Sequence, residues 1–163
     1  MQMPGEDRAI TGFKPSLTAA LGRGVAAGLG GTVVMTAFQK FVEMPITGRG
    51  ESYAPASFVE KVLPVARMRG KRRRAINYAT HFGIGAAWGA SHGLAEHAGL
   101  RGQRAVGTVF AAVYTGDALL NIALGLYKPW EWSAQDWVID VGEKLLLAQA
   151  TGFLYELMDP TAA

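Results

Sequence analysis

Five polar side chains fall inside stretches of the sequence that are otherwise apolar. They are His81, Asp117, Asn121, Glu143 and Lys144. Ionisable groups within a membrane-spanning helix are costly and usually face a partner or a wet cavity. Along their expected helices, His81, Lys144 and Asp117 lie about 9, 10 and 14 Å from the same end, at the helical rise of ~1.5 Å per residue. Because three helices supply these groups at similar depths, we expect them to meet in one half of the molecule.

Three kinds of chemistry fit this polar cluster. In the first, Asp117 pairs with Lys144 or hydrogen-bonds His81, and the cluster only locks the helices together. In the second, the groups form a proton relay or a substrate-binding cavity, because burial shifts the pKa values of acids and histidines. The third is a divalent metal site, but no two candidate ligands have tight sequence spacing. The sequence favours the lock, and we predict no metal and no cofactor.

The remaining chemical motifs are absent, so we predict no catalytic residue. The chain has no cysteine, which excludes a thiol nucleophile, a disulfide framework and a cysteine metal site. It has no phosphate-binding loop, no nucleophile elbow and no His-Glu-x-x-His motif. His81 and His92 lie about 16 Å apart on one helix, so they cannot ligate a single haem iron from both sides.

Four apolar stretches must position the cluster. They cover residues 17–39, 75–95, 105–126 and 137–158. Each has roughly the 20 residues that a helix needs to cross the hydrocarbon core of a bilayer. The fourth fits least well, because its first two turns are charged. The sequence therefore predicts one all-α domain over residues 1–163, an integral membrane four-helix bundle; a soluble helical bundle is the alternative.

Small residues repeat at four-residue spacing in every one of these stretches. The candidate packing residues are Gly24, Gly28, Gly85, Gly89, Gly93 and Gly152, and a further repeat runs through Gly107, Ala111 and Thr115. In water an interior glycine destabilises a helix by about 1 kcal/mol relative to alanine. In lipid the same glycine zipper lets two helix backbones approach closely. The spacing thus indicates close helix packing within a membrane.

The loop at residues 42–74 is expected to contain a helix of its own. Ser57 and Glu60 have capping-box spacing, a helical stripe of apolar residues follows, and Pro64 would end the helix. We therefore predict a short amphipathic helix over residues 57–63. It lies either at the membrane surface or against the end of the bundle.

A run of basic residues closes this loop. It comprises Arg67, Arg69, Lys71, Arg72, Arg73 and Arg74. The run contains no aromatic residue that would stack on a base, so we predict anionic lipid rather than nucleic acid as its partner. Counting basic residues on each side places the loops at 42–75 and 127–136 in the cytoplasm and both termini outside. Residues 1–15 lack a cationic start followed by an apolar core, so we predict no cleaved signal peptide.

Several motifs resemble those of a group of small actinobacterial four-span membrane proteins, broadly similar to the YagU-like inner-membrane proteins. They are the segments at 31–40, 47–56 and 81–89, and the Pro129-Trp130-Glu131-Trp132 motif with Asp140, Thr151, Gly152 and Tyr155. The resemblance implies a bacterial inner membrane and four spans, but no activity. This sequence departs from the pattern of the group at Glu143-Lys144, where the group tends to carry two histidines.

These observations lead to two functional hypotheses. The first is a non-enzymatic membrane protein that packs with itself or with a membrane partner through its small-residue helix faces. The alternative is a small proton- or ion-coupled transport or permeation unit that uses the intramembrane polar cluster. An enzyme that acts on lipids is a third and weaker alternative.

Overall fold

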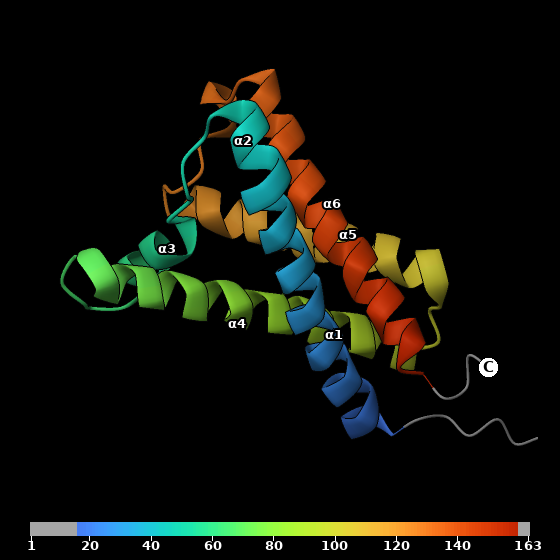
Figure 1. Ribbon diagram of the computed structural model, residues 1–163. Helices are drawn as coiled ribbons and strands as arrows, with labels where there is room; N and C mark the ends of the chain where they lie inside the picture. The colour runs from blue at the N-terminus through green and yellow to red at the C-terminus, as the bar shows by residue number, and fades with distance from the viewer. Residues whose placement is uncertain (1–15, 160–163) are drawn as a thin grey trace, which may run out of the picture.

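The computed structural model describes residues 16–159, and within this range the chain is α-helical without strands (Figure 1). The four long helices are α1 (Leu17–Phe38), α4 (Gly70–His97), α5 (Gly102–Ala123) and α6 (Ala134–Leu157). The short elements are the π-helical turn η1 (Gln39–Glu43), α2 (Met44–Thr47), α3 (Ala54–Val62) and the 3-10 turn η2 (Pro129–Glu131). The predicted all-α class is confirmed. The segment for which we predict no signal peptide lies outside the described residues.

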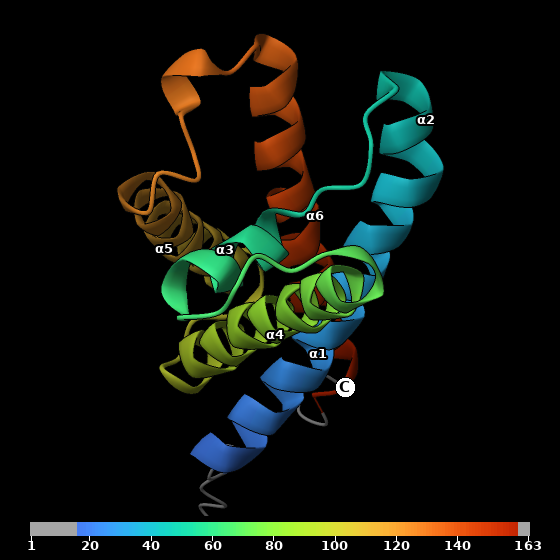
Figure 2. The same ribbon diagram turned by 90° about the vertical axis from the view of Figure 1, so that its left-hand side faces the viewer.

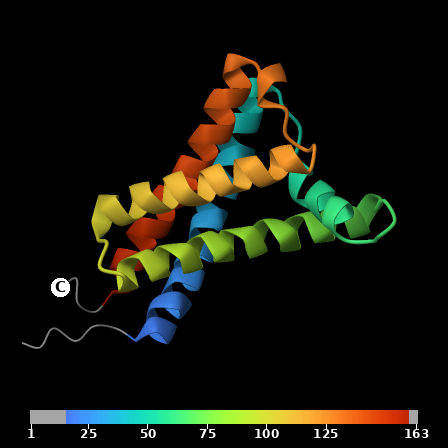
Figure 3. The ribbon, with the colours of Figure 1, turned by 180° about the vertical axis from the view of Figure 1, so that it is seen from behind.

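The long helices form two pairs that cross. Helices α1 and α6 lie side by side, and α4 and α5 run across them (Figures 1 and 3). Toward α2 and η2, the ends of α1 and α6 diverge, and the segment that leads to α3 enters between them (Figure 2). The buried core lies where the pairs cross and includes Met35, Trp88, Val106, Leu147 and Ala148. The helices therefore close tightly at the crossing and leave space at the diverging end.

The first helix extends beyond its predicted end. It was expected to stop at residue 39, but η1 and α2 continue it to Thr47. The amide of Met44 hydrogen-bonds the carbonyl of Gln39, and Pro45 follows in the first turn of α2. Because proline has no amide hydrogen, position 45 donates no hydrogen bond to the preceding turn, and the helix ends two residues later at Thr47. The other three long helices begin three to five residues earlier than predicted.

The predicted loop helix exists, but its predicted start and cap are wrong. Helix α3 spans Ala54–Val62 rather than 57–63, and Ser57 lies within it. The Glu60 carboxylate does not cap α3; it accepts a hydrogen bond from the Met68 amide at 2.9 Å. The only capping box in the described chain joins Ser133 and Asp136 at the start of α6. Helix α3 does end just before Pro64, where proline disfavours helical backbone at the preceding residue.

Glycines bring α1 and α4 into backbone contact. A Cβ atom built at Gly24 or Gly28 would fall within 3.0 Å of backbone atoms in α4, and one at Gly89 or Gly93 would do the same in α1. At Gly85 a Cβ atom would collide with the Thr32 side chain of α1. These glycines therefore serve the crossing within one chain.

Two of the helical segments are long and apolar enough to cross a membrane by length and composition alone. Within residues 16–159 they are Leu17–Thr47 and Gly102–Ala123. Helix α4 has no Asp, Glu, Lys or Arg between residues 75 and 95, but its histidines, Asn77 and glycines lower its hydropathy. Helix α6 carries Asp140, Glu143 and Lys144. The fold thus supports a membrane location only weakly.

Candidate functional site: a polar cavity between the diverging helices

The divergence of α1 and α6 leaves a partly open cavity of about 490 Å³. All five residues of the predicted polar cluster line it: His81 from α4, Asp117 and Asn121 from α5, and Glu143 and Lys144 from α6. Helix α1, the η1 turn, α3 and the segment between α2 and α3 complete the wall. The volume is within the range typical of small-molecule sites, about 300–1,000 Å³.

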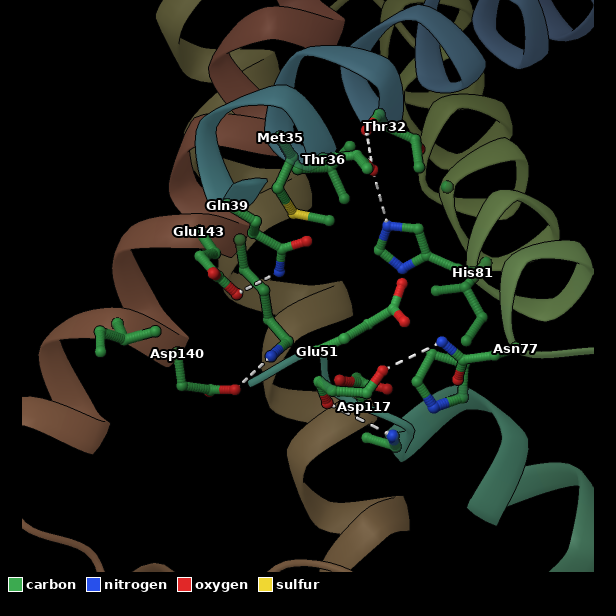
Figure 4. Close-up of a pocket in the computed structure, with 18 of the residues that line it drawn as sticks. Thr32, Met35, Thr36, Gln39, Glu51, Asn77, His81, Asp117, Asp140 and Glu143 are labelled. Carbon is green, nitrogen blue, oxygen red and sulfur yellow. Dashed lines mark hydrogen bonds and ion pairs between the residues drawn. The ribbon is translucent and has the colours of Figure 1, made fainter. Parts of the chain in front are cut away.

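Helix α1 and the η1 turn contribute hydrogen-bond partners for two cluster residues. Thr36 Oγ1 lies 3.1 Å from His81 Nε2, and the same hydroxyl donates to the Thr32 carbonyl at 2.7 Å. A hydroxyl whose proton is already donated accepts from the imidazole, which indicates a proton on Nε2 of His81. Gln39 Nε2 donates to Glu143 Oε2 at 2.7 Å (Figure 4). Because Gln39 begins the π turn, the irregular turn of the helix supplies part of the site, as π turns often do.

Lys144 and Asp117 have different partners from those that the sequence favoured. Lys144 forms a short ion pair with Asp140, one turn earlier on α6. Its ammonium also lies 5.6 Å from the ring centres of both Tyr114 and Tyr127. Asp117 Oδ1 accepts a hydrogen bond from Asn121 at 3.0 Å, and within residues 16–159 it makes no ion pair. The expected contacts of Asp117 with Lys144 or His81 are not formed.

Glu51 enters the cavity from the segment between α2 and α3. Its carboxylate accepts a hydrogen bond from the Tyr78 hydroxyl and lies 3.4 Å from the Arg74 guanidinium. The hydrogen bond from Tyr78, helped by the charge of Arg74, lowers the pKa of Glu51 below its ordinary value. Figure 4 shows Glu51, His81, Asp117 and Glu143 arranged around the same space. A loop residue thus completes a site that the helices build.

Sequence reasoning missed several residues that line the cavity. The missed polar residues include Thr36, Gln39, Glu43, Glu51, Asn77 and Asp140. Asp140 had a detectable signal, because it lies four residues before Lys144 and such pairs face each other on a helix. Nothing in the sequence placed Glu51 beside Tyr78. Among residues 16–159, no three histidine or carboxylate side chains converge closely enough to hold a metal ion.

A second polar network, also missed, ties the opposite end of the fold together. Arg101 bridges Glu96 at 2.9 Å and Asp159 at 3.0 Å, and Arg23 contacts Asp159 at 3.0 Å. The two carboxylate side chains are only 2% and 5% exposed. His92 is also buried here, next to Glu96. Arg23, as the single charge in the first apolar stretch, was the signal that could have revealed this network.

The remaining predicted residues lie away from the cavity or at its edge. Gly152 packs against Val106 and His92. In the basic run, Arg73 contacts Ser57 and Glu60 of α3, and Arg74 pairs with Glu51. Five members of the run are exposed: Arg67, Arg69, Lys71, Arg72 and Arg74. Part of the basic run therefore holds α3 and its loop, and part faces outward.

Comparisons with protein-family models, curated proteins and solved structures found no match for this chain. The resemblance to the YagU-like proteins therefore stays a prediction.

Proposed function

We propose that the chain is a non-enzymatic integral membrane protein that works as a small proton- or ion-coupled transport or permeation unit. One observation carries the proposal: a single cavity gathers His81, Asp117, Asn121, Glu143 and Lys144 from three helices. Ionisable groups within membrane helices commonly mark ion or proton pathways. Asp117 and Glu143 also have neutral hydrogen-bond partners rather than cations, which leaves their charge available to a passing ion.

Exposed apolar side chains support a lipid environment for the same fold. Phe41 and Ile46 are each 79% exposed, and Val138 is 73% exposed. Large apolar side chains exposed to this degree are unfavourable in water and natural in lipid. We propose a bacterial inner membrane, with the basic run on the cytoplasmic side near anionic lipid. Both termini are then outside.

The membrane location has a direct test. The protein should sediment with membranes after detergent-free lysis and resist extraction by alkaline carbonate, and recovery in the soluble fraction would overturn the proposal. Because the chain has no native cysteine, single cysteines can report orientation. Lys71→Cys, at an exposed position of the basic run, should react with a membrane-impermeant thiol reagent only in inverted vesicles.

The transport activity is tested with the full chain in liposomes. An imposed pH gradient should decay faster than in empty liposomes, and Asp117→Asn should abolish this flux while the protein remains folded. Glu156→Gln is the matched control, since it also converts a carboxylate to an amide but lies on the exposed face of α6. Equal flux in empty and protein-containing liposomes would reject the proposal.

Association with a second copy or a membrane partner is the second candidate function, and one observation favours it. The α1–α4 crossing within the chain already occupies Gly24, Gly28, Gly85, Gly89 and Gly93. In contrast, Gly107, Ala111 and Thr115 of α5 are exposed. Such a stripe lets two membrane helices approach closely. Ala111→Leu should then shift the protein to a smaller species on a native gel. Ala79→Leu, on an exposed face of α4, should not.

A further inference from the structure

We infer that the cavity selects an organic ammonium ion, which binds in competition with the ammonium of Lys144. The inference deepens the proposed function by naming the class of solute. It depends on the charge balance of the wall, the partners of each charged group and the aromatic faces beside them.

The wall of the cavity is negative although the chain is positive. Six carboxylates line the cavity against three lysine or arginine side chains, whereas the whole chain has a formal net charge of +3. The carboxylates are Glu43, Glu51, Asp117, Asp136, Asp140 and Glu143. A cleft lined by one sign of charge raises the local concentration of the opposite ion. The cavity therefore favours a cation over an anion or a neutral solute.

Three of these carboxylates make no ion pair within the described residues, although Lys144 lies near enough to Asp117 and Glu143 to act on their charge. Asp140 pairs with Lys144, Asp136 with Arg49 and Glu51 with Arg74. The other three accept hydrogen bonds from neutral groups: Glu43 from Thr47, Asp117 from Asn121, and Glu143 from Gln39. Lys40 does not neutralise them, because it is exposed and lies 4.9 Å from the ring centre of Tyr78. Half-buried carboxylates without a counter-ion attract one.

The wall already stabilises an ammonium group of its own. Lys144 combines the carboxylate of Asp140 with the ring faces of Tyr114 and Tyr127, and both aromatic faces and carboxylates attract ammonium ions. An incoming ammonium ion can use Asp117 and Glu143, but its charge is repelled by Lys144. The ammonium of Lys144 therefore competes with the incoming ammonium ion for the negative charge of the cavity.

The size of the cavity and its ligands point to an organic cation rather than a metal ion. A cavity of about 490 Å³ is far larger than a bare ion. No three acidic or histidine side chains of the described chain converge as metal ligands. Aromatic and aliphatic groups such as Phe58 and Leu120 also line the wall, which suits the apolar part of an amine.

Binding to the full-length protein in nanodiscs tests the inference with three probes of the same shape. Benzylammonium, benzyl alcohol and benzoate differ mainly in charge, and calorimetry should detect binding of benzylammonium alone. Asp117→Asn and Glu143→Gln should each weaken binding about tenfold, the effect of ~1.4 kcal/mol. The control Glu156→Gln should leave the affinity unchanged.

Variants of Lys144 test the proposed competition directly. Lys144→Met should tighten benzylammonium binding, because it removes a positive charge from the cavity. The double variant Asp140→Asn with Lys144→Met removes the ion pair as a unit and should bind like the wild type. It also covers the case in which the single variant fails to fold.

Three outcomes would overturn the inference: benzoate or benzyl alcohol binds as well as benzylammonium, none of the probes binds, or the carboxylate variants have no effect. The proposed function is tested by the flux measurement and can survive a failure of the binding experiment. If proton flux persists and depends on Asp117 while no ammonium probe binds, the protein transports protons or inorganic ions and only the solute class is wrong.

Discussion

Lys144 pairs with Asp140 on its own helix, and Asp117 on the facing helix α5 is left with Asn121 as its hydrogen-bond partner. The Lys144–Asp140 pair reaches α5 only through Tyr114, whose hydroxyl donates to Asp140 at 2.9 Å. Asp117 makes no ion pair to α6 within residues 16–159, and its side chain lines the cavity. This relationship is the reason for preferring a binding site over a purely structural role for the cluster.

Gly89 should be the position least tolerant of a larger side chain. A Cβ atom at Gly89 would fall within 3.0 Å of the Gly24 carbonyl oxygen and of the Gly28 backbone. Backbone atoms cannot move aside as a flexible side chain does, so Gly89→Ala should destabilise the fold by about 3 kcal/mol or more, at or above the upper end for overpacking. Thermal unfolding in detergent measures this loss.

Gly83 provides the matched control on the same helix. It is exposed and a Cβ atom there would meet nothing within 4 Å. Gly83→Ala should therefore be neutral or stabilise the helix by up to about 1 kcal/mol, since alanine is the better helix former. If the two variants had equal unfolding temperatures, the close α1–α4 crossing would be wrong.

Arg101 should stabilise the closed end of the fold through its two buried acceptors. Arg101→Gln leaves Glu96 and Asp159 without the cation that both contact at 3.0 Å or less. Losing one partner of a buried ion pair costs about 3–5 kcal/mol, and we expect the lower end because Arg101 is half-exposed. Arg104→Gln, an exposed position three residues later, should change stability little. Chemical denaturation of the two variants compares them directly.

The helices and their close packing were predictable because both leave patterns along the sequence. Apolar length located four long helices, and glycines at four-residue spacing indicated close helix packing. Neither pattern fixes how helices cross, so the divergence of α1 and α6 that opens the cavity was not foreseen. The loop was predicted to begin at residue 42, but a π turn and α2 continue the helix to Thr47. Glu51 reaches the cavity from outside the helices, and single-sequence patterns carry no information on such long-range contacts.

Acidification should loosen the segment that carries Glu51. Because the pKa of Glu51 is lowered in the fold by the Tyr78 hydroxyl and then by Arg74, the ionised carboxylate stabilises the folded state. This stabilisation is complete above the pKa of the unfolded chain and is lost as the pH falls through the folded-state pKa. The side chain is 23% exposed, so we expect less than about 1 kcal/mol.

A difference measurement isolates this effect from the other carboxylates. The unfolding temperatures of the wild type and of Glu51→Gln should differ at pH 7 and converge as the pH is lowered below the ordinary range of glutamate. Tyr78→Phe should reproduce most of the difference, since the Tyr78 hydrogen bond is the main cause of the shift. A pH-independent difference would show that the charge of Glu51 is not involved.

Asn77 should decide whether α3 stays docked against α4 at the mouth of the cavity. Its Oδ1 accepts a hydrogen bond from the Ala56 amide at 3.1 Å, and its Nδ2 donates to the Ser52 carbonyl at 3.0 Å. The side chain is buried, so Asn77→Ala leaves both backbone groups unsatisfied at a cost of about 1–3 kcal/mol each. Although Arg73 still contacts Ser57 and Glu60 of α3, losing both Asn77 hydrogen bonds should let α3 detach locally before the long helices unfold. Limited proteolysis should then cleave between α2 and α4 much faster than in the wild type. The control Thr80→Ala, which removes no hydrogen bond, should leave the cleavage rate unchanged.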